Sequence, residues 1–134
     1  MWSIGGQTFV FPVGFDEAPG AVLNDHTYCC AYDGSICGAD ANIKPDRVDD
    51  CRMWHSLRVG TRAADAKRLN TALFFTEFGA CIDDAGCAGE INAVLDACEE
   101  HNVGWAYWQF KKYWDITTQA GTQSEGFYNS DGTL

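Results

Sequence analysis

Six side chains suited to binding or cleaving a sugar lie near the ends of three apolar segments of this sequence. In chain order they are His26, Tyr28, Glu77, Trp108, Gln109 and Lys111. Hydrolysis of a glycoside with retention uses one carboxylate that attacks the anomeric carbon and one carboxylic acid, about 5 to 5.5 Å away, that protonates the leaving oxygen. Glu77 is the candidate for the attacking carboxylate, and the other five side chains are candidates for substrate binding. This chemistry implies no metal ion and no organic cofactor.

The neighbours of Glu77 decide whether its carboxylate can act as a nucleophile. A carboxylate near the end of an otherwise apolar strand loses hydration, so it has to be hydrogen-bonded to stay ionised. We expect His26 or Tyr28, from the neighbouring strand, to donate to Glu77. Trp108 offers a flat apolar face on which the C–H groups of a pyranose ring can rest.

Each of these residues also has an ordinary structural explanation. A lone strand glutamate is usually edge-exposed or salt-bridged, and a lone histidine or tyrosine is more often a packing residue than a catalyst. Taken alone, Trp108 is slightly better suited to the core than to a sugar platform, and Lys111 is typical of a solvated strand end. We expect His55 and His101, which fall in helical segments, to be solvated or partly packed.

The three apolar segments predict three β-strands. They lie near residues 21–28, 71–78 and 103–110. The first starts with apolar residues and turns polar, while the second is apolar on both faces almost to its end, which is typical of a buried parallel strand. In the third, Trp105 and Tyr107 share one face and Trp108 lies on the other, so only one of these sets can point into an interior.

The segment between the first two strands predicts a loop over residues 29–45, which a disulfide could hold, followed by a helix. We expect Asp46 to cap this helix and the helix to start near Val48. Its expected apolar stripe comprises Met53, Trp54, Leu57 and Val59. The helical pattern continues or restarts after Gly60, over residues 63–69.

A second helix is predicted over residues 88–101, where Ile91, Val94, Leu95 and Cys98 fall at helical spacing. Glu90 is expected in its first turn. The resulting order of strand, helix, strand, helix and strand is typical of parallel βαβ units. Three parallel strands cannot form a closed barrel, and the unpaired outer edges of the sheet favour pairing with further strands. We therefore predict an α/β fold, namely the C-terminal portion, about strands six to eight, of a TIM (β/α)8 barrel, in which working residues lie at the C-terminal ends of the strands.

The charge balance limits the partners. Nine basic and 19 acidic side chains give a formal net charge of -10, which disfavours nucleic acid and anionic lipid surfaces and leaves neutral sugars or uncharged glycolipid head groups as partners. No run approaches the roughly 18 apolar residues of a membrane-spanning helix. Contact with a membrane is expected only peripherally, through the substrate.

Seven cysteines in 134 residues indicate an oxidising compartment, which we take to be secretory or lysosomal. Spacing does not fix the pairing, although Cys81 with Cys87 and Cys37 with Cys51 could close short loops, and the odd count leaves one thiol free or paired outside the chain. Structural zinc is the competing interpretation, but the spacings do not fit a finger or ribbon. Residues 1–7 lack the basic and apolar segments of a signal peptide, so we expect the natural protein to start further upstream.

Three motifs resemble glycoside hydrolase family 5. Thr76-Glu77-Phe78-Gly79 is similar to the T-E-F-G motif of the seventh strand, whose glutamate is the family's nucleophile. Residues 25–29 resemble the H-x-Y segment of the sixth strand, and residues 105–111 resemble the W-x-Y-W-Q-F-K run of the eighth strand in the endoglycoceramidase branch. Residues 12–20 and 125–132 are similar to segments flanking the barrel in that branch. The resemblance implies a substrate that is either a glycosphingolipid, cleaved between sugar and ceramide, or a simpler β-glucoside of a lipid.

The sequence departs from this family at the acid/base glutamate. That residue lies in an N-E-P motif on strand four of the family, and this sequence contains no N-E-P. Strands one to five and the C-terminal β-sandwich of the endoglycoceramidase branch also have no counterpart. We therefore expect residues 1–134 to be a partial catalytic domain, truncated at both ends, with a post-barrel tail over residues 111–134. We expect the isolated chain not to turn over glycosides. The alternatives are a non-catalytic remnant and a secreted, disulfide-stapled carbohydrate-binding domain.

Overall fold

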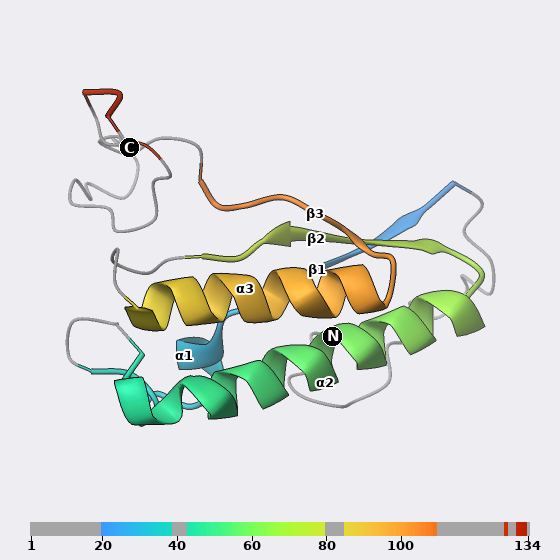
Figure 1. The fold of residues 1–134 in the computed structure, drawn as a ribbon. Helices are drawn as coiled ribbons and strands as arrows, with labels where there is room; N and C mark the ends of the chain where they lie inside the picture. The colour runs from blue at the N-terminus through green and yellow to red at the C-terminus, as the bar shows by residue number, and fades with distance from the viewer. Residues whose placement is uncertain (1–19, 39–42, 80–84, 110–127, 129–130, 134) are drawn as a thin grey trace.

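Three parallel strands and two long helices make up most of the described chain. The computed structural model describes residues 20–38, 43–79, 85–109, 128 and 131–133. Its elements are β1 (Val22–His26), α1 (Cys29–Tyr32), the 3₁₀ helix η1 (Pro45–Arg47), α2 (Val48–Arg68), β2 (Ala72–Glu77), α3 (Ala85–Glu100) and β3 (Gly104–Trp105). The strands form one sheet in the order β1-β2-β3, with both pairs parallel (Figure 1). The predicted βαβ order is therefore present, whereas its membership of a larger barrel stays a prediction.

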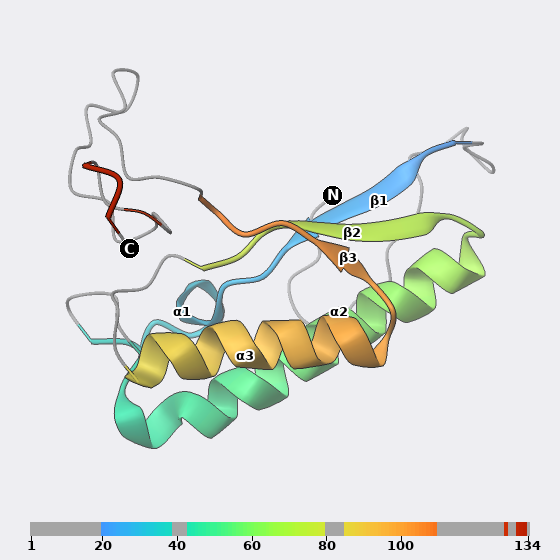
Figure 2. The same cartoon turned by 45° about the horizontal axis from the view of Figure 1, so that its top comes forward.

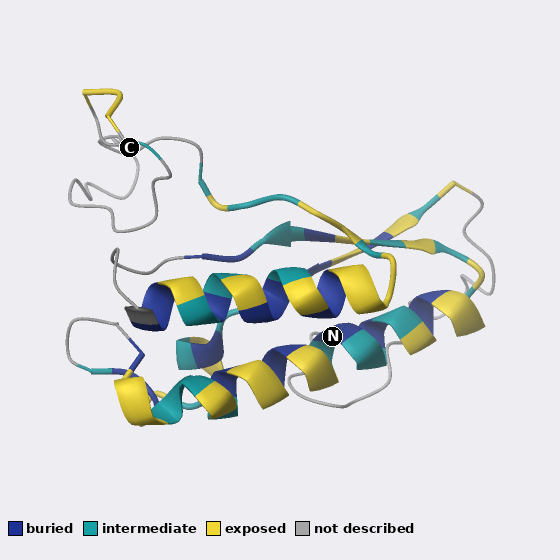
Figure 3. Cartoon of the chain, viewed as in Figure 1, coloured by how far each residue is buried: buried dark blue, intermediate teal, exposed yellow. Residues whose placement is uncertain are grey.

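The two long helices cover the same face of the sheet. Helices α2 and α3 lie side by side beneath the strands in Figure 1, and the turned view of Figure 2 shows the same layering. One apolar cluster fills the space between the two layers. It comprises Val59, Phe75, Phe78, Val94, Ala97 and Cys98, all nearly inaccessible to solvent. Figure 3 shows the buried sides of the helices turned toward the sheet.

The opposite face of the sheet is not covered by the described helices. Two of its large apolar side chains are well exposed, Val22 at 56% and Phe74 at 36%. Trp105 does not belong to this face, because it pairs with the buried Phe75 and its ring packs edge-on against Phe78. The alternation along β1 explains this division, since Leu23, which faces the helices, is buried whereas Val22 is exposed. The sheet therefore has one packed face and one open face.

Two disulfides hold the segment that follows β1. Cys29 pairs with Cys51 and Cys30 pairs with Cys37. The predicted Cys37–Cys51 pair is therefore wrong: the folded chain places Cys51, on α2, beside Cys29. Within segment 29–45, α1 and an antiparallel bridge from Cys37 to Ile43 replace part of the expected loop.

The other two described cysteines are Cys87 and Cys98. Cys98 is free and fully buried on α3, and burial raises the pKa of its thiol from 9.0 to about 11. Cys87 is disulfide-bonded, while Cys81, its predicted partner, lies outside the described residues. Within the described part of the chain no group of three or more histidine, cysteine or acidic side chains could hold a metal ion.

Helix α2 differs from its prediction in three respects. It runs without interruption from Val48 to Arg68, through Gly60. Asp46 lies in η1 and does not cap it, since the N-cap residue is Arg47 and makes no side-chain capping hydrogen bond. The predicted apolar stripe is only half correct, because Met53 and Leu57 are exposed whereas Trp54 and Val59 are buried.

The buried face of α2 contains polar as well as apolar residues. It includes His55, Arg62 and Asp65, all nearly inaccessible to solvent. The expectation that His55 would be solvated or partly packed is therefore wrong, while His101, just after α3, is exposed as expected. The polar partners of these α2 residues lie on β1, just after it, on α2 itself and on α3, as described below.

Helix α3 and the third strand also differ from the predicted boundaries. Helix α3 starts three residues before the predicted Ala88, so Glu90 falls beyond its first turn. Strand β3 is limited to Gly104 and Trp105, and a separate bridge joins Gly79 to Trp108. Lys111, residues 12–19 and most of the tail 111–134 lie outside the described residues. None of the described helices is both long and apolar enough to cross a membrane.

Candidate functional site

Glu77 is the last residue of the central strand. Its side chain is 28% exposed, so it is partly shielded and still open to solvent. An irregularity in the β1–β2 pairing places it: the register runs evenly from Val22↔Ala72 to Asp25↔Phe75 and then shifts, so that His26 pairs with Glu77. The shift brings the polar end of β1 beside the carboxylate.

Tyr28 holds the Glu77 carboxylate. Its hydroxyl donates a hydrogen bond to Glu77 Oε1 at 2.8 Å, and His26 Nδ1 lies 3.7 Å from Glu77 Oε2. The predicted donation from the neighbouring strand is thus present for Tyr28. The histidine is beyond hydrogen-bond distance and acts at most as an electrostatic partner. One carboxylate oxygen is therefore fixed by a donor, while the other faces an imidazole.

A buried ion network fixes the backbone of His26. Arg58 Nε donates to the His26 carbonyl oxygen at 3.0 Å and Arg58 Nη2 donates to Asp25 Oδ1 at 2.6 Å. Asp25 Oδ1 also accepts from the His26 backbone N–H at 2.9 Å. Arg62 donates to Asp25 Oδ2 at 3.0 Å and also pairs with Asp65. Two cations from α2 therefore surround the carboxylate that precedes His26.

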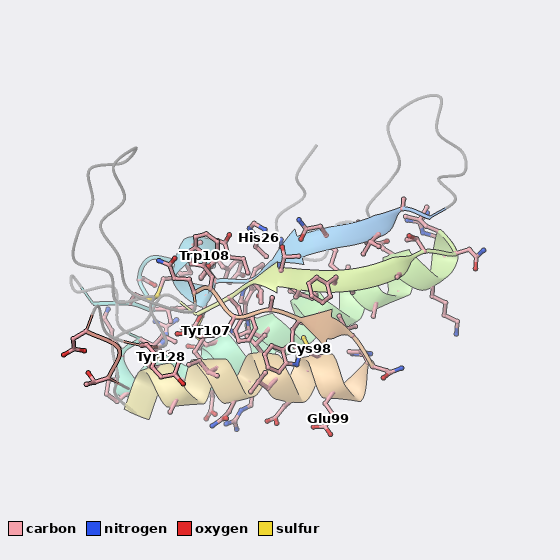
Figure 4. All side chains as sticks on the ribbon, turned by 90° about the horizontal axis from the view of Figure 1, so that it is seen from above. His26, Cys98, Glu99, Tyr107, Trp108 and Tyr128 are labelled. Atoms are coloured by element: carbon pink, nitrogen blue, oxygen red, sulfur yellow. A yellow bond between two sulfur atoms is a disulfide. The ribbon has the colours of Figure 1, made fainter. Side chains whose placement is uncertain are left out.

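The third strand segment brings Trp108 to the same end of the sheet. The Trp108 N–H donates to the Phe78 carbonyl oxygen at 2.9 Å, and Trp108 is 38% exposed. Figure 4, which looks down on the sheet, shows His26 and Trp108 at this end. Tyr107 instead packs edge-on against Phe78, in the core between sheet and helices. Trp108 is therefore exposed, while its neighbour Tyr107 is packed in the core.

Gly79 makes this approach possible. Its φ is +123°, and a Cβ at this position would lie 2.7 Å from the Tyr107 ring and 2.8 Å from the Trp108 carbonyl oxygen. Any side chain there would push the third segment away from the end of β2. Gln109 is described and half-buried, and the bond joining it to Trp108 is a cis peptide.

Three residues behind the site were not among the sequence candidates. Thr27 Oγ1 lies 2.7 Å from His55 Nδ1, and Glu90 accepts a hydrogen bond from the Cys29 backbone N–H at 3.1 Å. All three side chains are nearly inaccessible to solvent. For His55 and Glu90, the signal is a polar residue at a helix position that the 3.6-residue period assigns to the interior, whereas Thr27 lies outside the helices and carries no such signal.

Comparisons of this chain with protein-family models, with curated proteins and with solved structures found no match. The site is therefore interpreted from its own geometry. A carboxylate hydrogen-bonded at one oxygen and partly open to solvent, with an exposed indole at the same sheet end, can attack an electrophilic carbon or bind a polyol.

Proposed function

We propose that Glu77 is the carboxylate nucleophile of a retaining glycoside-hydrolase site and that the chain is the strand-six-to-eight portion of a TIM barrel. The observation that carries this proposal is the hydrogen bond from Tyr28 to Glu77 at the C-terminal end of the central strand. In parallel α/β barrels this end carries the active site. The open sheet face, with exposed apolar side chains, agrees with strands that continue in a larger assembly.

In this proposal each residue has a separate role. Glu77 attacks the anomeric carbon through one oxygen while Tyr28 orients the carboxylate through the other, so the nucleophile does not need to be reoriented during attack. His26 lies close enough to bind a sugar hydroxyl or to stabilise the ionised carboxylate. Trp108 supplies the apolar platform, and Gln109 and Lys111 remain candidates for polar contacts with the sugar.

The proposed substrate is an uncharged glycoside, with a glycosphingolipid as the favoured class. The net charge of -10 disfavours a polyanion and, by the same reasoning, nucleic acid. Two disulfides among the described residues agree with an oxidising compartment, and we propose a secreted or lysosomal protein. Peripheral membrane contact would then occur through the lipid of the substrate.

This sequence contains no N-E-P motif, which carries the acid/base residue in family 5. The experiment that tests the proposal therefore uses a substrate whose leaving group needs no acid, so that nucleophilic attack by Glu77 is observed by itself. A dinitrophenolate leaving group departs without protonation, and a fluorine in place of the hydroxyl next to the anomeric carbon slows hydrolysis of the covalent intermediate. The chain is incubated with such a dinitrophenyl fluoroglucoside. We expect the Glu77 carboxylate to displace dinitrophenolate and form an ester to the sugar, seen as a glycosylated peptide by mass spectrometry.

Two variants control this experiment. Glu77→Gln removes the nucleophile and should abolish the adduct, whereas Glu99→Gln, at an exposed position of α3 (Figure 4), should leave labelling unchanged. Ordinary alkyl glycosides should not be hydrolysed by the chain alone, since nothing protonates their leaving oxygen. Failure of the wild-type chain to form an adduct, or an adduct that survives Glu77→Gln, would overturn the proposal.

A non-catalytic carbohydrate-binding domain is the second candidate. The exposed indoles of Trp105 and Trp108 favour it, because both offer apolar faces to a sugar. This candidate expects sugar-dependent tryptophan fluorescence that Glu77→Gln leaves unchanged and that Trp108→Ala removes. It also expects no covalent adduct with the activated glucoside. The same samples therefore distinguish the two functions.

A further inference from the structure

Three consecutive residues at the end of β1 face alternately into the molecule and toward the site. Tyr28 has φ −136° and ψ 118°, an extended conformation in which neighbouring side chains point to opposite sides. Thr27 and Cys29 accordingly point toward the helices and are 1% and 0% exposed. The Tyr28 hydroxyl lies on the opposite side, where it reaches Glu77.

The residue before Tyr28 is held by α2 and β2. Thr27 Oγ1 lies 2.7 Å from His55 Nδ1, and both groups are buried. The Thr27 backbone N–H donates to the Glu77 carbonyl oxygen at 3.2 Å. The position of Thr27 is therefore fixed relative to both the strand that carries the candidate nucleophile and the helix behind it.

The residue after Tyr28 is held by α2 and α3. Cys29 forms the disulfide with Cys51, with a Cα–Cα distance of 5.4 Å, and its N–H donates to Glu90 Oε1 at 3.1 Å. Cys51 and His55 are four residues apart on α2, so they lie on one face of the helix, one turn from each other. Adjacent turns of one helix thus hold the two residues that flank Tyr28.

Glu90 links the two anchors. The oxygen that accepts from Cys29 also lies 3.3 Å from His55 Nε2. That contact is not aligned as a hydrogen bond, and Nε2 has no other hydrogen-bond partner among the described residues. The contact is therefore electrostatic, and it keeps the imidazole between a hydroxyl on one side and a carboxylate on the other.

We propose that His55, Cys51 and Glu90 form a buried clamp that positions Tyr28 for its hydrogen bond to Glu77, which makes His55 and Glu90 positioning residues of the site. The assignment of a catalytic site rests on the function proposed above, whereas the clamp itself rests on contacts alone. The groups are those of a serine-type triad, but here the hydroxyl lies at Nδ1 instead of Nε2 and the carboxylate is not hydrogen-bonded to the ring. Thr27 cannot attack a substrate here, because its side chain is sealed beneath the sheet.

The clamp is tested by substitutions at Thr27 that change one atom group. Thr27→Val replaces the hydroxyl by a methyl of similar size, and Thr27→Ser keeps the hydroxyl. The readout is the NMR chemical shift of the ring carbon that bears the hydroxyl in labelled tyrosine, with the Tyr28 signal assigned from Tyr28→Phe. Glu77→Gln supplies the reference shift of Tyr28 without its ionised acceptor.

We expect Thr27→Val to move the Tyr28 signal toward the Glu77→Gln reference and Thr27→Ser to restore it. Labelling by the activated glucoside should slow by about tenfold in Thr27→Val, which corresponds to loss of one hydrogen bond to a charged group. An unchanged Tyr28 signal in Thr27→Val would overturn the clamp, as would a shift that Thr27→Ser fails to restore. A wild-type chain that gives no adduct would overturn the proposed function while the tyrosine signal still tests the clamp.

A second pair of variants applies if Thr27→Val does not fold. His55→Asn places a polar atom near the position of Nδ1, and His55→Gln places one near the position of Nε2. Asn leaves a larger gap in the packing than Gln does, so a purely structural role predicts that His55→Asn shifts the Tyr28 signal at least as far as His55→Gln. The clamp predicts that His55→Asn stays closer to the wild-type signal than His55→Gln does. The reverse order, or equal shifts, would contradict it.

Discussion

Replacing Arg62 by methionine tests whether the ion network behind β1 stabilises the fold. Arg62 is 3% exposed and donates to the carboxylates of both Asp25 and Asp65, which are themselves buried. Removing one partner of a buried ion pair costs about 3 to 5 kcal/mol, because a charge is left without compensation. Here Asp25 keeps Arg58 and Asp65 keeps Arg68, so we expect the lower end, about 3 kcal/mol.

The assay is urea unfolding followed by tryptophan fluorescence and far-UV circular dichroism. A loss of about 3 kcal/mol is a large share of the 5 to 15 kcal/mol typical of a domain, and it should lower the urea midpoint by at least about 1 M. Arg52→Met on the same helix is the control, because Arg52 is 59% exposed and lies 3.8 Å from an exposed carboxylate. We expect that control to change stability by less than about 0.5 kcal/mol. Equal losses in the two variants would refute the argument.

Two further predictions concern Gly79 and the free thiol. Gly79→Ala should destabilise the chain by about 3 kcal/mol, because its positive φ and the close Trp108 carbonyl leave no room for a Cβ, while Gly34→Ala, with nothing within 4 Å, should be nearly neutral in the same urea assay. Burial raises the Cys98 pKa from 9.0 to about 11, so the protonated thiol favours the folded state, and stability should fall as pH rises across that interval. Unfolding measured across this range should show a loss up to about 3 kcal/mol larger in the wild type than in Cys98→Ala; parallel curves would contradict it.

The strands could be predicted from the sequence because their signal is local. Residues 71–78 are apolar and end at a glycine, and β2 forms within that span. The third strand was predicted too long, since only Gly104 and Trp105 pair with β2 before the backbone departs from regular pairing. A hydrophobic pattern marks which residues are buried, but it does not say where a neighbouring strand stops offering hydrogen bonds.

The pairing of cysteines and the buried face of α2 could not be predicted for a different reason. Cys51 was assigned to Cys37, which is closer in sequence, yet it bonds to Cys29 because α2 packs beneath the end of β1. Met53 and Leu57 were expected in the core, but the helix turns polar residues inward instead. The cause lies outside the helix: Asp25 on β1 and Thr27 just after β1 are buried polar residues that need partners, and the residues near α2 in the sequence do not reveal this need.

The polarity of β1 changes along its length on both faces, and this change ties the fold to the site. Toward the helices, the apolar Leu23 is followed by Asp25 and Thr27, while toward the open face, Val22 is followed by Asn24 and His26. Beyond the point where regular pairing stops, apolar packing cannot fix a backbone, because burial favours no single direction. Hydrogen bonds and a disulfide are directional, and they occur where Tyr28 has to be aimed. The buried polar side chains of α2 are therefore explained by the end of β1, where directional contacts are needed to fix a backbone that presents polar groups to the open face of the sheet.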